Sequence, residues 1–403
     1  YKVVATKVAS GASNIMTGKA VIVGNPLPIV TFGYEYYKTI TIDHTQVSGT
    51  EDLIDYPLLV AFTDPDLATT GNGGKLLSAN GYDVAFTDAA GNPLKHEIIQ
   101  YNSTSGLYSA WIRVPVVSYD TDTDIQMLYS KSGITSDPSS HETWSSEYVQ
   151  VMHLDGDFQD ATQYGNFGFN WGTSSVAGKV LSGRSFDGVN DMIIVEDDVN
   201  LDGTNDEATF SLWINWVASD NGGYQRVMTS SNRGGSPNNG YEWSSRNLGE
   251  HFFYPKCDNA WVNYNLGPNP FTDGIWQHLA VTLNYSTKSV KIYVDGVPMV
   301  FTTTNVPSFW TELAEIDHWR WGGEPGYFAG LMDEIRIQTV ERSEDWLLTE
   351  FRNQDDPSSF YSVSAEADYD PLPEICPGSP PFTLDQASPA GGTYSGTGVT
   401  GGV

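Results

Sequence analysis

The sequence predicts an all-β protein built from antiparallel β-sandwich domains in tandem, with linker segments at both ends. Three observations predict this fold class. Many short segments alternate apolar and polar residues with the period of a strand. Turn-forming clusters such as TGNGG, AAGNP and SNRGGSPNNG separate these segments. Only one segment has the pattern of a helix, and strands without intervening helices favour antiparallel sandwiches over βαβ units.

Four segments show the clearest strand alternation. Their apolar residues are Ile112, Val114 and Val116; Ile125, Met127 and Tyr129; Phe210, Leu212, Ile214 and Trp216; and Val290, Ile292 and Val294. The helix is predicted over residues 343–354, because Ser343 is a suitable N-cap and Glu344 and Asp345 suit a first turn.

Changes in composition divide the chain into four regions. Residues 1–34 are predicted to be the tail of a preceding module and a linker. Residues 35–147 form a first sandwich, and residues 148–362 form a second, larger one. Residues 363–403 begin with an acidic, Pro-rich linker, ADYDPLPEICPGSPP, and continue into the start of another repeat module. The sequence therefore reads as part of a longer multidomain polypeptide that is exported.

The charge of the chain limits its partners. Its 403 residues include 50 acidic and 20 basic residues, for a net charge of −30. A nucleic acid or an anionic membrane requires a basic surface, so neither is expected as a partner. No apolar run reaches the roughly 18 residues of a membrane span, so the chain is not expected to be membrane-embedded. The two cysteines, Cys257 and Cys376, are expected to be independent thiols or to pair elsewhere, rather than to bridge each other.

Four motifs in the second region carry a family resemblance. They are SGRSFDGVNDMIIV, ATFSLWINW, WQHLAVTLNYSTKSVKIYVDG and FAGLMDEIRI, in this order and followed by the predicted helix. This region resembles the laminin-G-like branch of the concanavalin A-like lectin/glucanase superfamily. The resemblance implies a jelly roll of two sheets, with loops that often bind sugars or calcium.

Two further resemblances concern the flanking regions. The segments YYKTITID, DYPLLVAF, GYDVAFTDAAGNPLKHEI, SAWIRVPVV and TDIQMLYS resemble a bacterial domain of unknown function that commonly precedes such a lectin-like domain. The terminal PFTLDQASPAGGTYSGTGV resembles repeats in giant surface proteins of gliding Bacteroidetes, which the type IX system exports. This resemblance implies an extracellular location at the bacterial cell surface.

The sequence contains no complete catalytic pattern of a known type. Retaining glycosidases of the superfamily place two glutamates on one face of a strand in an E-x-D-x-E arrangement. The nearest match is Glu315-Ile316-Asp317-His318-Trp319, in which Trp319 replaces the last carboxylate. Glu366 and Asp368 repeat half of the pattern in the linker, and the seven histidines have no HExxH spacing. We expect no enzyme activity.

A calcium site is expected at Asp333 in the strand LMDEIRI. Strict alternation places Asp333 on the same face as Leu331, Ile335 and Ile337, so its carboxylate would point towards the core. A buried carboxylate requires a cation, an Arg or several N–H donors. The family resemblance implies calcium, with Asp155 as a second ligand. The alternative is that backbone amides, or an Arg such as Arg184, satisfy the carboxylate.

A second calcium candidate is the loop DDVNLDGTNDE. Asp198, Asn200, Asp202 and Asp206 supply oxygens at the spacing of a calcium loop, but Thr209 occupies the closing position where a Glu is needed. Asn, Asp and Gly also favour ordinary turns, so the alternative is a polar connection between two strands.

Aromatic residues in irregular segments predict a glycan-binding rim in the second region. Sugars stack their CH groups on aromatic rings while their hydroxyls bind polar partners. The candidate residues are Tyr241, Trp243, Trp261, Trp319 and Trp321. The alternative is that these rings close the ends of the sandwich.

These observations favour a non-catalytic, adhesive region of a surface protein that binds a polysaccharide or a cell-surface glycan. The alternative function is a pair of structural spacers stiffened by calcium. A divergent glycoside hydrolase, or an accessory domain of one, is the third reading.

Overall fold

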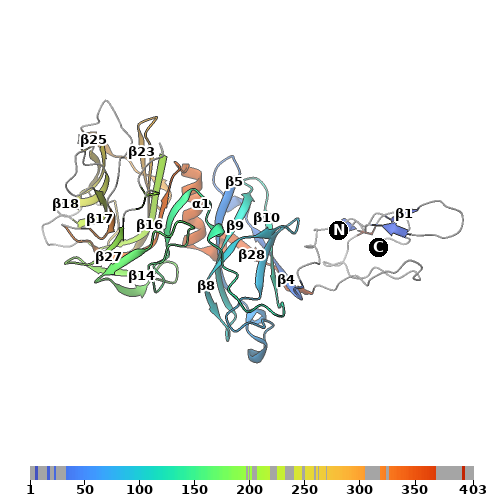
Figure 1. Ribbon diagram of the computed structural model, residues 1–403. Helices are drawn as coiled ribbons and strands as arrows, with labels where there is room; N and C mark the ends of the chain where they lie inside the picture. The colour runs from blue at the N-terminus through green and yellow to red at the C-terminus, as the bar shows by residue number, and fades with distance from the viewer. Residues whose placement is uncertain are drawn as a thin grey trace. The chain divides into compact units, whose positions relative to one another are not determined.

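A computed structural model describes most of the chain (Figure 1). The described residues are 33–196, 207–217, 225–231, 240–246, 250–257, 263–268, 270–304, 318–323 and 326–368, with shorter pieces at 5–7, 16–18, 22–23, 198, 200–201, 260–261 and 393–394. They are mostly strands, with α-helices at α1 (Glu344–Asp355) and α2 (Pro357–Phe360), so the predicted all-β class is confirmed. None of the helices among these residues is long and apolar enough to cross a membrane.

The chain divides into two compact units. The first contains Tyr1–His44, Ile54–Ser140 and Ser358–Val403, and the second contains Thr45–Leu53 and His141–Pro357. Three short segments therefore belong to a different unit from the one that the sequence predicted for them. Thr45–Leu53 and residues 141–147 lie within the predicted first sandwich but belong to the second unit. Conversely, residues 358–362 lie within the predicted second sandwich but belong to the first unit.

The first unit contains two antiparallel sheets. The larger sheet has, in spatial order, β28 (Tyr361–Val363), β4 (Tyr36–Ile42), β10 (Thr123–Tyr129), β6 (Val84–Asp88) and β7 (Pro93–Leu94), and β29 (Ala367–Asp368) also pairs with β4. The smaller sheet has β5 (Leu53–Thr63), β9 (Leu107–Val117) and β8 (His96–Asn102). The sheets meet at Phe86, whose ring centroid lies 5.1 Å from that of His96 and 6.4 Å from that of Tyr108. Two short ladders near the termini join β1 (Ala5–Lys7) to β2 (Met16–Gly18) and β3 (Ile22–Val23) to β30 (Thr393–Tyr394).

The second unit contains two larger antiparallel sheets. The eight-stranded sheet has the order β13 (Ser174–Ala177), β14 (Ser182–Asp187), β27 (Ala329–Gln338), β16 (Glu207–Trp216), β22 (Trp276–Asn284), β23 (Ser289–Val294) and β24 (Val297–Pro298), with β11 (Tyr148–Met152) also paired to β27. The nine-stranded sheet has the order β12 (Gly168–Trp171), β15 (Met192–Glu196), β26 (His318–Trp321), β17 (Gln225–Ser231), β18 (Gly240–Arg246), β19 (Glu250–Cys257), β21 (Asn263–Pro268) and β25 (Thr302–Thr304), with β20 (Ala260–Trp261) paired to β19.

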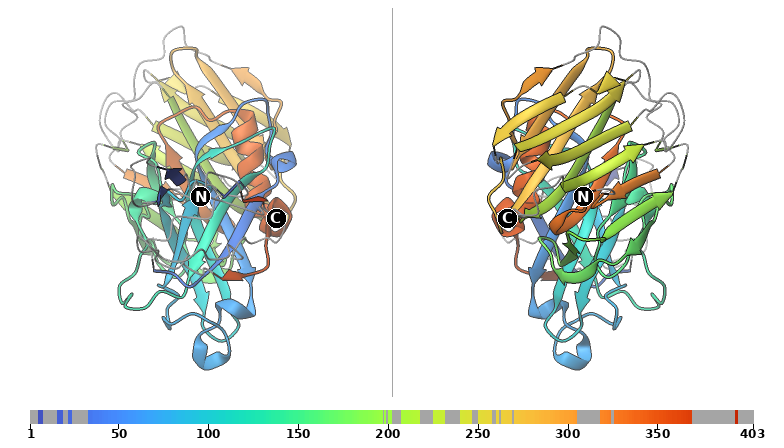
Figure 2. Two further views of the ribbon diagram at one scale, coloured as in Figure 1. Left: turned by 90° about the vertical axis from the view of Figure 1, so that its right-hand side faces the viewer. Right: turned by 90° about the vertical axis from the view of Figure 1, so that its left-hand side faces the viewer.

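The core of the second unit lies between these two sheets. Phe210 from β16 contacts Tyr241 and Trp319 of the other sheet, at ring-centroid distances of 4.8 and 5.2 Å. In the right-hand view of Figure 2, the yellow strands of the nine-stranded sheet lie side by side. Alternating residues of both sheets point into this core, as the period of a strand requires.

Helix α1 covers the outer face of the eight-stranded sheet, where Figure 1 shows it beside β16. Its predicted N-cap is confirmed, because the Ser343 hydroxyl accepts a hydrogen bond from the Trp346 backbone N–H. The Trp213 indole N–H donates to Gln354 Oε1 at 2.6 Å and so joins the sheet to the helix. Both faces of this sheet are therefore covered.

Candidate functional site

Four of the five residues of the predicted glycan-binding rim are not at the surface. Tyr241, Trp243, Trp319 and Trp321 expose between 0 and 2 % of their surface and belong to the core between the two sheets. This expectation is therefore wrong for these four residues, since none of them can offer a ring face to a sugar. The side chain of Trp261 lies outside the described residues.

These rings are buried because they point inwards from strands in the middle of the sheet. Trp319 and Trp321 are two residues apart in β26, so both face the core, and their rings stack with centroids 6.1 Å apart. Tyr241 and Trp243 are also two residues apart, in β18, and both face the core. The Tyr241 hydroxyl lies 2.8 Å from that of Tyr285. The polar residues around them in the sequence concealed a strand pattern.

Asp333 is fully buried, and backbone amides satisfy its carboxylate. Its Oδ2 accepts hydrogen bonds from the N–H groups of Lys179 and Val180, both at 2.8 Å, and its Oδ1 accepts one from Glu334 N–H at 2.8 Å. Burial and then the Glu334 charge raise the pKa of Asp333 well above its usual range, and the three donors offset only part of this rise. This arrangement is the amide-capped alternative to a calcium ligand.

The predicted direction of the Asp333 side chain is wrong, because β27 contains a bulge. The register against β16 shifts between Ser211 and Trp213, and Glu334 adopts a φ of 50°. Strict alternation fails at this point, so Met332 rather than Leu331 shares the core with Ile335 and Ile337. Asp333 instead lies opposite Trp213, on the face that α1 covers.

The other predicted calcium ligands make local contacts. Asp155 accepts a hydrogen bond from the Ser182 hydroxyl. Asp198 Oδ1 accepts one from the Asn200 backbone N–H at 2.9 Å, which is the geometry of a polar turn between β15 and β16. Asp202 and Asp206 lie outside the described residues. Within the part of the chain that the structure describes, none of these residues joins a group of three metal-ligating side chains.

A network of buried charged residues connects α1 to the eight-stranded sheet. Arg336 donates to Glu334 Oε2 at 3.0 Å and to Glu350 Oε1 at 3.1 Å, and His278 Nε2 lies 3.5 Å from Glu350 Oε1. Burial would raise the pKa of Glu350, but the Arg336 charge and the His278 contact lower it to about 2. Glu334 also contacts His153, with 2.8 Å between Oε1 and Nδ1. Because Arg336, Glu334 and Glu350 are almost fully buried, this network is structural.

The described part of the chain contains only fragments of the incomplete catalytic patterns. Glu315 and Asp317 lie outside the described residues, and Trp319, at the position of the missing carboxylate, is buried in the core. In the first unit, Glu366 accepts hydrogen bonds from Lys75 and the Tyr129 hydroxyl. Cys376 and the side chain of Cys257 lie outside the described residues.

A row of exposed aromatic side chains runs along β12, the strand at one end of the nine-stranded sheet, and includes Phe167 directly before it. Phe167 and Phe169 are each 46 % exposed, and Trp171 is 58 % exposed. The rings of Phe167 and Phe169 meet edge to face with centroids 5.3 Å apart. We call these three residues the β12 strip. The β12 strip was not among the predicted sites, although FGFNW shows the alternation of a strand with aromatic residues on one face.

The strip points outwards because the inner face of β12 has almost no side chain. Gly168 lies so close to the core that a Cβ there would be 2.6 Å from Ile193 Cγ2 and 3.0 Å from Met152 Sδ. Successive strand residues face opposite sides, so the aromatic residues on either side of Gly168 face away from the core. Asn170 is held by Thr173, whose hydroxyl donates to Asn170 Oδ1 at 2.6 Å.

Polar groups lie beside the end of the strip. The turn at residues 187–191 contacts the chain just after Trp171, since a Cβ on Gly172 would lie 2.0 Å from Asp191 Oδ1. In this turn the carboxylate of Asp187 accepts a hydrogen bond from Val189 N–H at 2.8 Å, which lowers its pKa, so Asp187 is charged at neutral pH. Val189 is itself 66 % exposed. Apolar surface and hydrogen-bonding groups therefore adjoin here.

The strip has the dimensions of a surface for an extended ligand. Residues two apart on a strand are separated by about 6–7 Å, so three alternate residues extend over about 13 Å. Rings at this spacing offer apolar contact without a deep cavity. The arrangement suits non-covalent binding.

Comparison with known families agrees with this architecture. Residues 187–347 match the concanavalin A-like lectin/glucanases superfamily, and residues 80–174 match a domain of unknown function, DUF2341. Residues 187–347 form a concanavalin A-like domain. The predicted pair of domains in this order is therefore confirmed. Strand β12 lies within the residues of the second match and pairs with β15 of the concanavalin A-like domain. We refer to the whole second unit as the concanavalin A-like unit.

Solved structures align with part of the chain at low sequence identity. One is domain 4 of an extracellular arabinanase from Geobacillus stearothermophilus in complex with arabinotriose, with 17 % identity, a TM-score of 0.41, and coverage of 51 % of this chain and 98 % of that domain. Another is the binding domain of paraclostridial mosquitocidal protein 1, with 15 % identity, a TM-score of 0.42, and coverage of 51 % and 52 %. The receptor-binding domain of a botulinum neurotoxin C/D mosaic has 12 % identity, a TM-score of 0.41, and coverage of 52 % and 51 %. The chain thus spans about half the length of the two toxin domains. No curated protein matches the sequence.

Proposed function

We propose that the concanavalin A-like unit binds a neutral polysaccharide or cell-surface glycan through the β12 strip. The observation that carries this proposal is the row of Phe167, Phe169 and Trp171, exposed together on one face of an end strand. The membership of residues 187–347 in a lectin/glucanase superfamily supports a sugar as the ligand.

The chemistry of the strip favours a ligand without charge. A net charge of −30 repels anionic polysaccharides at long range, and the strip consists of apolar rings whose end adjoins the turn at residues 187–191, which carries the charged Asp187. Pyranose CH groups stack on such rings, and sugar hydroxyls can donate to a carboxylate. Extended chains are favoured over single sugars, because several sugar units are needed to cover about 13 Å of strand.

We propose binding without catalysis. A retaining glycosidase needs two carboxyl groups about 5–5.5 Å apart on the two sides of the bond that it cleaves. The strip is built from aromatic rings, and the strand that would carry such a pair has the buried Trp319 at the second position.

We further propose that the chain is part of a large secreted bacterial surface protein, in which this unit supplies adhesion. The resemblance of the terminal segment to type IX-exported repeats supports this setting. The calcium-stiffened spacer is the alternative, and the amide donors around Asp333 count against calcium at that residue. We therefore expect the melting temperature to stay the same when calcium is added or removed with a chelator.

Binding to insoluble polysaccharides tests the proposed function. The full chain is mixed with neutral particles, such as cellulose, chitin and arabinan, and with anionic alginate, and the bound fraction is measured. The variant Phe167→Ala/Phe169→Ala/Trp171→Ala is expected to lose binding by more than about tenfold, since burying one large apolar side chain is worth roughly 1.5–3 kcal/mol.

A matched control carries substitutions of exposed apolar residues elsewhere in the same unit. Ile275 and Val300 are 54 % and 89 % exposed, and Ile275→Ala/Val300→Ala should bind as the unsubstituted chain does. Equal losses in both variants would show non-specific adsorption. Binding to no glycan would leave the spacer as the better account, and release of reducing sugar would contradict the absence of catalysis.

A further inference from the structure

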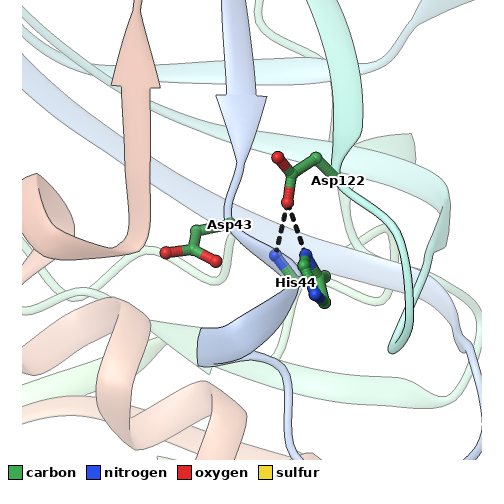
Figure 3. Close-up of side chains that lie close together, drawn as sticks. All are labelled: Asp43, His44 and Asp122. Atoms are coloured by element: carbon green, nitrogen blue, oxygen red, sulfur yellow. Dashed lines mark hydrogen bonds and ion pairs between the residues drawn. The ribbon is translucent and has the colours of Figure 1, made fainter.

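Three side chains with metal-ligating atoms meet in the first unit (Figure 3). They are Asp43, His44 and Asp122, and one ligand atom from each lies within 4.8 Å of the others. Asp43 follows strand β4, His44 begins the short 3-10 helix η2 (His44–Gln46), and Asp122 precedes β10. Among the described residues, this is the group of three such side chains that the structure brings together.

The pairing of β4 with β10 explains why these residues converge. Ile42 lies opposite Thr123 in this antiparallel ladder, so the next residues along the two strands are Asp43 and Asp122. Two carboxylates are therefore placed on facing positions at the end of the ladder. Like charges in this arrangement are destabilising unless a cation lies near them.

His44 contacts one of these two carboxylates. Its Nδ1 lies 2.6 Å from Asp122 Oδ1, and its backbone N–H donates to the same oxygen at 3.1 Å. Figure 3 shows the imidazole close to Asp122, and Asp43 directly before His44 on the same stretch of chain. The side chains of His44 and Asp122 remain 38 % and 53 % exposed, so solvent and ions reach both.

We propose that Asp43, His44 and Asp122 bind a divalent transition-metal ion, with zinc as the best fit. Two carboxylate oxygens and one imidazole nitrogen are zinc ligands, and three protein ligands with water in the remaining position form a common zinc arrangement. Calcium fits less well, because it selects oxygen ligands only.

The distances require a small adjustment of the side chains. Ligand atoms bound to zinc at about 2.0–2.2 Å lie closer to one another than 4.8 Å, so the three groups must draw together. Rotation about side-chain bonds achieves this because the residues are at the surface. The bound ion takes the place of the direct contact between His44 Nδ1 and Asp122 Oδ1.

Isothermal titration of the full chain with zinc, in an excess of magnesium, tests this proposal. Magnesium occupies the diffuse acidic surface that a net charge of −30 creates, and it competes poorly for an imidazole. The expected result is one zinc ion per chain. Asp43→Asn, His44→Gln and Asp122→Asn should each weaken binding by more than about tenfold, a loss that even the removal of an outer partner of a metal site can produce.

Two control variants separate this site from general attraction. Asp120→Asn removes a charge from the same turn, where Asp120 accepts a hydrogen bond from the Ser118 hydroxyl. His141→Ala removes another exposed histidine, whose Nδ1 lies 2.8 Å from the Ala161 carbonyl oxygen. Both should bind zinc with unchanged affinity. If Asp120→Asn weakens binding as much as Asp122→Asn does, or if no zinc binds in magnesium, the proposal is wrong.

A spectroscopic measurement on the unsubstituted chain is independent of folding in the variants. Zinc should shift the ring signals of one histidine in the proton NMR spectrum, and these signals should be missing from the spectrum of His44→Gln. A shift of His141 signals, or of none, would overturn the assignment. This result does not depend on whether the concanavalin A-like unit binds glycan.

Discussion

Two groups of aromatic residues in one sheet of the concanavalin A-like unit have opposite environments. Trp243, Trp319 and Trp321 lie on interior strands and are buried, whereas Phe169 and Trp171 lie on the end strand β12 and are exposed. Both groups have polar, turn-forming residues as neighbours in the sequence, and for the exposed group these are glycine and asparagine. Position in the sheet, and not the neighbouring residue types, therefore decides which rings are available to a ligand.

The difference separates stability from binding. A ring inside the core contacts residues of both sheets, and its removal leaves a cavity that the packed interior fills only in part. A ring on the outer face of β12 is largely hydrated, so its removal leaves no cavity. Substitutions in the two groups should therefore affect different measurements.

The largest expected effect is the loss of stability in Trp243→Ala. Trp243 is fully buried, with ring centroids of Phe253 and Phe271 at 6.1 and 6.2 Å. Its truncation should lower the free energy of unfolding by about 3–5 kcal/mol, as measured by urea denaturation. Trp243→Phe retains a ring and should lose less. A loss below about 1 kcal/mol in Trp243→Ala would contradict its place in the core.

The next effect concerns the close contact that turns the strip outwards. In Gly168→Val the new side chain meets Ile193 and Met152, so β12 must move away from the core. We expect a loss of about 1–3 kcal/mol in unfolding free energy and weaker glycan binding, although all three aromatic residues remain. Gly71→Val, in the first unit, is the control, because a Cβ on Gly71 has no neighbour within 4 Å and its φ lies outside the left-handed region. Unchanged stability in Gly168→Val would show that β12 does not lie against Ile193.

A smaller effect is expected in the pH dependence of stability, through a buried histidine of the same sheet. His251 is fully buried between Trp216 and Phe271, at ring-centroid distances of 4.5 and 4.9 Å, and burial lowers its pKa to about 3. The unfolded chain binds a proton at this residue near pH 6.5, whereas the folded chain does not until the pH approaches 3. Neutral His251 therefore makes its full contribution to the free energy of unfolding above pH 6.5, and this contribution is lost as the pH falls towards 3.

Unfolding free energies between pH 7 and pH 4 check this prediction. His251 alone should lower stability by about 1 kcal/mol at pH 6, and by more at lower pH. His251→Phe should reduce the slope of stability against pH. Some slope should remain, because burial also lowers the pKa of His96 in the first unit to about 4. An unchanged slope in His251→Phe would mean that His251 is protonated in the folded state.

Local sequence patterns predicted the elements better than the site. Alternation identified β16, and Ser343 identified the start of α1, because both signals depend on residues next to each other in the chain. The bulge at Glu334 reversed the predicted direction of Asp333, and no local pattern marks it. The exchange of short segments between the units also depends on contacts distant in sequence, such as that of Tyr361 with Ile42.

The exposure of the β12 strip could not be predicted from the alternation of residues alone. The letters FGFNW indicate a strand with aromatic residues on one face, but they do not say which face meets the core. Pairing with β15 places Gly168 opposite Val195 and against Ile193, and this long-range contact decides the orientation. The metal-ligating group in the first unit likewise depends on the register of β4 with β10, which joins residues almost 80 positions apart, such as His44 and Asp122.

The smallest expected change in stability, and the sharpest test of the comparison, is Trp171→Ala. Because Trp171 is 58 % exposed, its truncation should alter the free energy of unfolding by no more than about 0.5 kcal/mol. The same variant should weaken binding to the neutral polysaccharide that the unsubstituted chain retains, and Trp171→Phe should restore most of it, because stacking requires a ring but not an indole. A destabilisation close to that of Trp243→Ala would mean that Trp171 packs as a core residue, which would leave the β12 strip without a ligand-facing role. Unchanged stability with reduced binding would instead place the two functions of aromatic residues, packing and recognition, on different strands of one sheet.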